Sequence, residues 1–96
     1  MRFEWDIEKE RTNIQKHGLS FGEASLVFAD SRTIYISDPD HSLGEIREIA
    51  LGTIENITIA VVIFVDRSGN DEEIIRIISA RPATNLEKAQ YYSADI

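Results

Sequence analysis

Ile57-Thr58-Ile59-Ala60-Val61-Val62-Ile63-Phe64-Val65 is the most apolar stretch of this 96-residue chain, and it decides the fold. β-Branched residues dominate it, and a short, almost continuously apolar run between turn signals is typical of a strand buried on both faces. Glu55-Asn56 separates it from residues 45–54, a second strand-like segment. The sequence therefore predicts a hairpin in which 57–65 is a central strand.

Two further strands are predicted on either side of this hairpin. Residues 33–37 are β-formers and are followed by the turn sequence Asp38-Pro39-Asp40. Residues 72–81 supply a long strand that ends before Pro82, because proline lacks the N–H group that a ladder needs. Strands that follow one another through short connections pair antiparallel.

The first predicted helix runs from an Asp6 cap to about His17, and Gly18 ends it in the left-handed conformation. Its apolar stripe is thin, since only Ile7 and Ile14 recur at helical spacing. We therefore expect this helix to lie at the surface.

Two capping boxes predict two more helices. Ser20 and Glu23 begin one, and Thr84 and Glu87 begin another that continues to about Tyr92. The helix after Ser20 has a single apolar face that must pack on a sheet. Its apolar residues are Phe21, Ala24, Val27 and Phe28.

These elements, together with the alternating residues 3–5 at the start, predict one α+β domain over residues 1–96. We expect an antiparallel sheet of four to five strands, with two N-terminal helices and one C-terminal helix packed on it.

Composition excludes several classes of protein. No apolar run reaches the roughly 18 residues that a membrane-spanning helix needs. Acidic residues stand where a secretory signal would be apolar. The chain contains no cysteine, which excludes disulfides and thiolate metal sites and suits a reducing compartment, so we expect a cytoplasmic protein.

The formal net charge of −7 repels nucleic acid at long range, so any phosphate site must depend on a local group of arginines. Arg47, Arg67, Arg76 and Arg81 fall on or beside the predicted sheet. Strict alternation places Arg76 on the face of Ala80, and Arg81 on the other face unless a bulge turns it. The alternative for each arginine is an ion pair with one of the acidic residues.

Other side chains that carry chemistry are sparse. His17, at the carbonyl end of the first helix, either donates to a phosphate or caps the helix. Tyr91 offers a phenol group or packs in the core. The histidines and carboxylates match no metal-ligand spacing, and no serine stands in a nucleophile-elbow sequence, so we expect no metal and no cofactor.

Several short blocks, in their order and spacing, resemble the BrnT family of toxins along nearly the whole chain. They are Phe3-Glu4-Trp5-Asp6, Asn13, Lys16-His17-Gly18, Ser20-Phe21-Gly22-Glu23-Ala24, Val27-Phe28, His41-Ser42, Gly44-Glu45, Arg47, Arg76-Ile77-Ile78-Ser79-Ala80-Arg81, Glu87 and Tyr91. The resemblance implies a RelE-like fold and a type II toxin that cleaves RNA and blocks translation. It also implies a BrnA-type antitoxin partner, with DNA contacted only through that antitoxin during repression of their shared promoter.

The resemblance further implies metal-free cleavage, in which the ribose 2′-hydroxyl attacks the adjacent phosphate. Such a reaction needs a base, an acid and cations that stabilise the phosphate. The implied catalytic residues are His17, Glu45, Arg47, Arg76 and Arg81. The implied substrate-binding residues are Lys16, His41, Arg67 and Tyr91, of which His41 and Tyr91 are also reserve candidates for acid or base.

Two other functions are weighed against the ribonuclease. An inactive or weak toxin fold that only holds an antitoxin predicts arginines locked in internal ion pairs, whereas the ribonuclease predicts arginines that converge without carboxylate partners. The acidic surface favours a basic antitoxin. A small-molecule enzyme would need a deep pocket, for which so small a core leaves little room.

Overall fold

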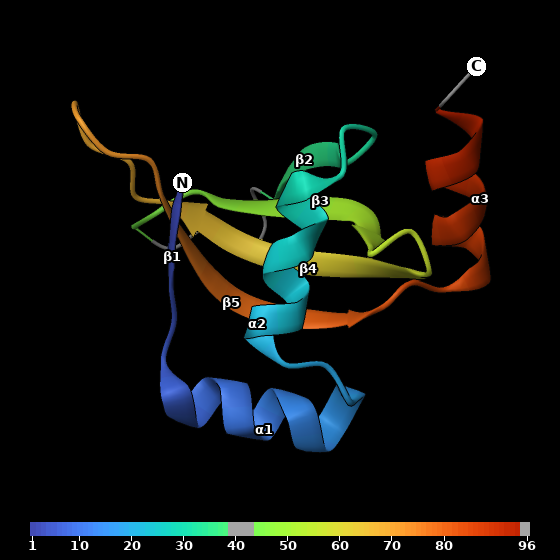
Figure 1. The fold of residues 1–96 in the computed structure, drawn as a ribbon, viewed down its shortest axis with the longest axis horizontal. Coiled ribbons are helices and arrows are strands. Elements are labelled where there is room, and N and C mark those ends of the chain that lie inside the picture. The colour runs from blue at the N-terminus through green and yellow to red at the C-terminus, as the bar shows by residue number, and fades with distance from the viewer. Residues whose placement is uncertain (39–43, 95–96) are drawn as a thin grey trace.

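A computed structural model describes residues 1–38 and 44–94, and it shows an α+β fold built on a five-stranded sheet with the order β1-β5-β4-β3-β2 (Figure 1). The strands are β1 (Arg2–Glu4), β2 (Ile34–Asp38), β3 (Arg47–Ile54), β4 (Thr58–Asp66) and β5 (Ile74–Pro82). The helices are α1 (Ile7–His17), α2 (Phe21–Ala24), the 3₁₀ helix η1 (Ser25–Ala29) and α3 (Asn85–Ser93). The predicted fold class is confirmed. No helix in the described ranges is long and apolar enough to cross a membrane.

β4 lies at the centre of the sheet, as its apolar sequence predicts, and pairs antiparallel with β3 and β5. The turn between β3 and β4 uses Glu55 and Asn56, whose φ angles are 52° and 61°. One detail differs from the expected antiparallel sheet, because β1 pairs parallel with β5. Strands so far apart in the chain are free of the hairpin constraint and can run in the same direction.

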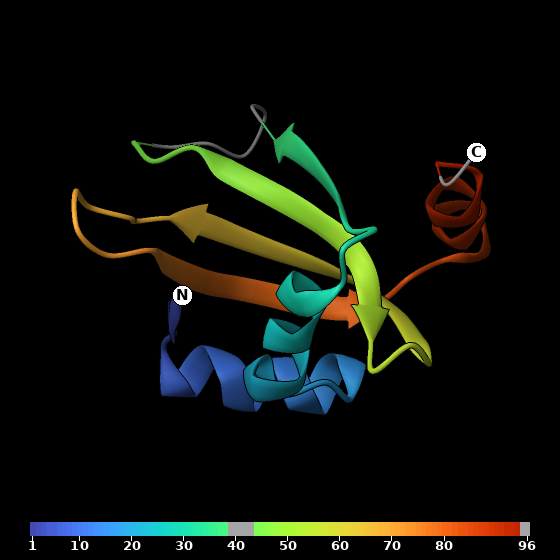
Figure 2. The same cartoon turned by 45° about the horizontal axis from the view of Figure 1, so that its top comes forward.

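The main core lies between one face of the sheet and the segment α2–η1, with α1 beside it (Figure 2). Phe21, Ala24 and Val27 are fully buried, and Phe28 is half-buried against the same cluster. They pack on Val62 and other inward-facing residues of β4 and β5. The apolar face predicted for the second helix is therefore the face that covers the sheet.

The first helix is attached by a polar side chain rather than by its isoleucines. Ile7 and Ile14 are exposed, in agreement with the predicted surface position of the helix. Asn13 is buried instead, and its Nδ2 donates to the carbonyl oxygens of Leu19 at 2.9 Å and Ala80 at 2.8 Å. Its Oδ1 accepts from the Ala80 N–H at 3.1 Å. Since β1 ends beside Arg76, this amide continues the ladder along an edge of β5 that β1 does not reach.

A bulge in β5 changes which residues share a face. Ile63 pairs with Ser79 but Phe64 pairs with Ile77, so Ile78 is an extra residue in β5. Ala80 therefore joins the main core, on the face opposite Arg76, which corrects the strict alternation expected from the sequence. The bulge also brings Arg81 to the face of Arg76.

We predict that Asn13→Ala lowers the free energy of unfolding by about 2–4 kcal/mol, because it leaves buried backbone groups of Leu19 and Ala80 without partners. Urea unfolding followed by circular dichroism measures this loss. The control is Gln15→Ala, which removes an exposed amide from the same helix and should change stability little. Equal stabilities of the two variants would show that the amide bridge contributes nothing.

Candidate active site

The sheet face opposite α2–η1 carries a row of charged residues at one end. Cross-strand partners share a face, and the register sets them side by side. From β2 to β1 the row contains Asp38, Arg47, Val65, Arg76 and Glu4. We call this face the open face, because no helix of the described residues covers it at this row (Figure 2).

Two arginines of this region share acidic partners. Arg67 forms a bidentate pair with Glu45, with Nε to Oε2 at 3.0 Å and Nη2 to Oε1 at 2.7 Å. Glu4 lies between Arg67 and Arg76, with its Oε1 at 3.4 Å and 3.5 Å from their Nη1 atoms. Glu4, Glu45, Arg47, Arg67 and Arg76 form the sheet-end cluster. Four predicted site residues, Glu45, Arg47, Arg67 and Arg76, therefore lie in one region.

The Arg67–Glu45 pair is tight in geometry but open to solvent. The hydrogen bond from Arg67 lowers the pKa of Glu45, and the same bond raises the pKa of Arg67. Their side chains remain 40% and 49% exposed. An ion pair exposed to this degree contributes little to stability. Its planar, two-pronged geometry is also the one that a guanidinium uses to bind phosphate.

Arg81 lies outside this cluster, at the end of β5, and is tied to α3. Its Nη1 and Nη2 donate to the two oxygens of Glu87, each at 2.8 Å. Arg81 lowers the pKa of Glu87 to about 2, and Thr84 adds smaller hydrogen bonds. Glu87 is also half of the capping box that begins α3. The pair therefore joins the end of the sheet to the first turn of the helix.

Tyr91 uses its phenol group inside the fold. Its side chain is 4% exposed, and its hydroxyl donates to Asp30 Oδ2 at 2.6 Å. The same oxygen accepts from the backbone N–H and the hydroxyl of Thr53, both at 2.9 Å. Burial raises the pKa of Asp30, but these hydrogen bonds and one from Arg32 outweigh it and lower the pKa to about 2.

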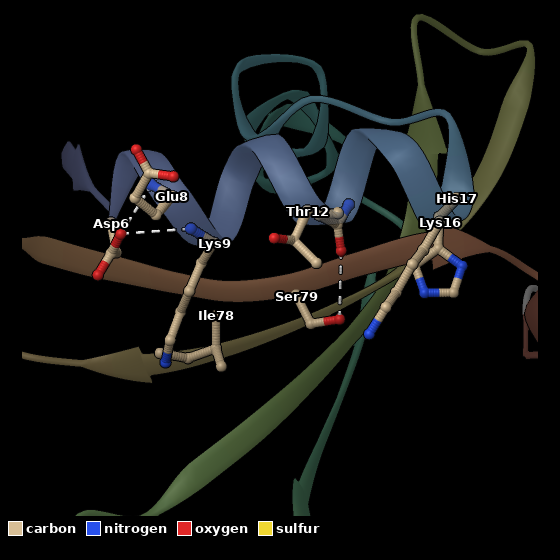
Figure 3. Close-up of a pocket in the computed structure, with 9 residues that line it drawn as sticks. Asp6, Glu8, Lys9, Thr12, Lys16, His17, Ile78 and Ser79 are labelled. Atoms are coloured by element: carbon tan, nitrogen blue, oxygen red, sulfur yellow. Dashed lines mark hydrogen bonds between the residues drawn. The ribbon is translucent and has the colours of Figure 1, made fainter.

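Lys16 and His17 line a second site, a groove of about 360 Å³ between α1 and β5. Figure 3 shows Lys9 and Lys16 extending from the helix toward Ile78 and Ser79 of the strand. The groove is completed by Asp6, Glu8, Thr12 and Asn13. Sequence reasoning missed Lys9, although its separation of seven residues from Lys16 places both on one helix face.

The predicted site residues thus occupy three places rather than one. They are the sheet-end cluster, the α1 groove, and the junction of β5 with α3 that holds Arg81 and Tyr91. His41 lies outside the described residues. Within residues 1–38 and 44–94, no three His, Asp or Glu side chains are grouped so as to hold a metal ion.

Comparisons with known proteins agree on a single family. A family model described as "Ribonuclease toxin, BrnT, of type II toxin-antitoxin system" matches residues 5–87. The crystal structure of the Brucella abortus ribonuclease toxin BrnT is 30% identical in sequence, with a TM-score of 0.62. That match covers 88% of this chain and 99% of the Brucella chain. A comparison with curated proteins finds no match.

We predict that Asp30→Asn lowers the free energy of unfolding at pH 7 by about 1–2 kcal/mol, since the carboxylate holds β3 and α3 together. The pKa of Asp30 in the folded protein is about 2, below its ordinary value of 3.8. Its contribution is therefore complete above about pH 4 and is lost as the pH falls through about 2.

Urea unfolding of both proteins between pH 7 and pH 2 tests this, with Asp71→Asn, an exposed acid in the connection before β5, as the control. The gap between wild type and Asp30→Asn should narrow toward pH 2. A gap that stays constant across the range would contradict the role of the carboxylate.

Proposed function

The chain belongs to the BrnT family of ribonuclease toxins of type II toxin–antitoxin systems, and we propose that it is a metal-free endoribonuclease whose active centre is the sheet-end cluster. Family membership confirms the resemblance seen in the sequence. The placement of the reaction is our own inference, and it is supported chiefly by the exposed bidentate pair of Arg67 with Glu45.

In this pair the carboxylate of Glu45 binds Arg67 in the same two-pronged way as a phosphate group would. The two carboxylate oxygens of Glu45 accept hydrogen bonds from the same two guanidinium nitrogens that would donate to two phosphate oxygens. Arg76 lies close to Arg67 because Glu4 contacts both arginines. Arg47 belongs to the same cross-strand row as Arg76. An entering phosphodiester can therefore exchange with Glu45 at little cost, because the Arg67–Glu45 pair is solvent-exposed, and can then contact guanidinium groups from different strands.

The exchange would also prepare a base. Once Arg67 binds phosphate, Glu45 loses the hydrogen bond that lowers its pKa and becomes a better proton acceptor. Glu45 then takes the proton of the ribose 2′-hydroxyl while its oxygen attacks phosphorus. The bond to the 5′ oxygen breaks, leaving a 2′,3′-cyclic phosphate and a 5′-hydroxyl.

The arginines would stabilise the charge that builds on the phosphate oxygens during this step. The 5′ oxygen must also receive a proton, which water can deliver because the Arg67–Glu45 pair is open to solvent. His17 lies in the α1 groove, at the opposite end of α1 from Glu4 and Arg76, so we infer that it contacts the RNA backbone beyond the reacting phosphate. Lys9 and Lys16 in the same groove would hold the RNA backbone.

Type II toxins act with a protein antitoxin, and we infer that the partner here is BrnA-type. We further infer that RNA cleavage blocks translation, and that the complex represses its promoter through the DNA-binding part of the antitoxin. The net charge of −7 supports a basic partner, because opposite charges speed the encounter of two proteins.

A second function is favoured by one observation. Arg67, Arg76 and Arg81 each have an acidic partner in the structure. This differs from the arginines without carboxylate partners that were expected of a ribonuclease, and it is what a toxin fold that only binds an antitoxin predicts. In that case the wild-type protein would bind its antitoxin and cleave no RNA. RNA cleavage by the purified wild-type protein separates the two functions.

We predict that Arg76→Ala lowers the rate of RNA cleavage by about 100-fold or more, because removing one preorganised donor to the phosphate typically costs that much. The rate is measured on purified protein and cellular RNA in buffer with EDTA, followed by primer extension to map new ends. Full wild-type activity in EDTA is expected for metal-free chemistry.

Arg11→Ala is the matched control, since it removes an exposed arginine from α1 that pairs only with Glu8 in the described structure. It should cleave like wild type. Arg67→Lys should also be slow, because lysine cannot form the two-pronged contact. An Arg76→Ala variant as active as Arg11→Ala would remove the cluster from the active site, and an inactive wild type would favour the binding function.

A further inference from the structure

The open face carries an apolar row beside the charged one. Ile36 of β2 is opposite Ile49 of β3, which is opposite Ile63 of β4. We call these three residues the isoleucine row. Ile36 is 52% exposed, and Ile49 and Ile63 are half-buried. Side chains of this type gain free energy when a partner removes them from water.

The isoleucine row lies between the charged row on one side and an apolar cluster covered by α3 on the other. On one side lies the next residue pair along the strands, Arg47 and Val65, with Arg76 beyond. On the other side, Leu51 and Val61 are buried under Tyr91 of α3, and Ile49 packs against that group. The isoleucine row therefore continues an apolar surface that α3 already covers at one end of the sheet.

The dimensions of the row match one helix. Three adjacent strands span about 10 Å, since neighbouring strands are about 4.8 Å apart. An α-helix with its side chains is about 10 Å wide. The next pair of side chains along the strands is only about 7 Å away, so a helix on the row would also cover Arg47 and Val65, which lie beside Arg76.

We propose that the isoleucine row is the docking surface for the antitoxin, which lays the apolar side of an amphipathic helix across it and thereby blocks the sheet-end cluster. The inhibition of RNA cleavage by this contact rests on the proposed function, but the binding of the antitoxin to the isoleucine row does not require catalysis. Neutralisation would then be direct occlusion, with RNA and antitoxin excluding one another.

Charge and chemistry select this occupant over the others. A second copy of this chain would bring another charge of −7 to the contact, whereas a basic antitoxin is attracted to it. RNA bases are held by aromatic side chains, and isoleucine offers neither a π face nor a charge. A protein with an apolar helix face meets the row with the matching chemistry.

The test is Ile36→Asp, with Ile57→Asp as the matched control. Ile57 is 83% exposed in the turn between β3 and β4, outside the isoleucine row. Calorimetric titration with purified BrnA-type antitoxin should give about tenfold or weaker binding for Ile36→Asp, and wild-type binding for Ile57→Asp. Ile36→Ala should show a smaller loss, and circular dichroism confirms that each variant is folded.

The same proteins distinguish the other occupants. Wild-type affinity of folded Ile36→Asp overturns the proposal. Slower RNA cleavage with unchanged antitoxin affinity would assign the row to RNA, and a wild-type dimer that Ile36→Asp makes monomeric in sedimentation would assign it to a second copy. Either result also overturns it. If wild type cleaves no RNA but Ile36→Asp still loses the antitoxin, the proposed function fails and the docking surface stands.

Discussion

The sheet has inner strands that are longer than its outer ones, and the backbone groups left over must be hydrogen-bonded. β1 contains three residues and β2 contains five, whereas β4 and β5 contain nine each. Asn13 pairs with Ala80 where β1 has ended, and Asp30 accepts from Thr53 beyond the start of β2. An unpaired buried N–H or carbonyl would cost about 1–3 kcal/mol, so these two side chains decide where the flanking segments can lie.

Each of these contacts also positions a helix. Asn13 fixes α1 along the edge of β5, and this contact forms the groove that holds Lys16 and His17. Asp30 binds Tyr91 and so anchors α3 at the far end of the sheet. With the helices held in these places, no helix of residues 1–38 and 44–94 covers the charged row or the isoleucine row. The open face is therefore a consequence of how the sheet edges are completed.

The ion pairs of Arg81 and Arg67 differ in how firmly the carboxylate partner is held by the rest of the fold. Glu87 belongs to the first turn of α3, and its side chain is 23% exposed. Its pair with Arg81 is therefore structural and connects the end of β5 to α3. Glu45 is about half exposed and precedes β3, so its pair with Arg67 can exchange with a ligand. Residue type alone does not separate these two cases, because the distinction lies in the burial and attachment of the carboxylate.

Local signals in the sequence predicted the elements well, because caps and apolar runs act within a few residues. The Asp6 cap, both capping boxes and the central strand at 57–65 are present. Contacts between residues far apart in the chain could not be predicted from these local signals. Nothing near Asn13 indicates that its amide meets Ala80, and strict alternation gave the wrong face for Ala80. The three separate locations of the predicted site residues likewise depend on contacts between distant segments.

The extra residue in β5 has a consequence for comparing relatives of different length. Arg76 and Arg81 are separated by an odd number of positions, yet they share a face because Ile78 shifts the register. In a homologue with one residue fewer between them, the two arginines would be separated by an even number of positions. They would then share a face only if the strand had no bulge, because alternate residues of a regular strand point to the same side. A one-residue gap at this point in an alignment therefore marks a change in strand geometry, with both arginines still facing the same way.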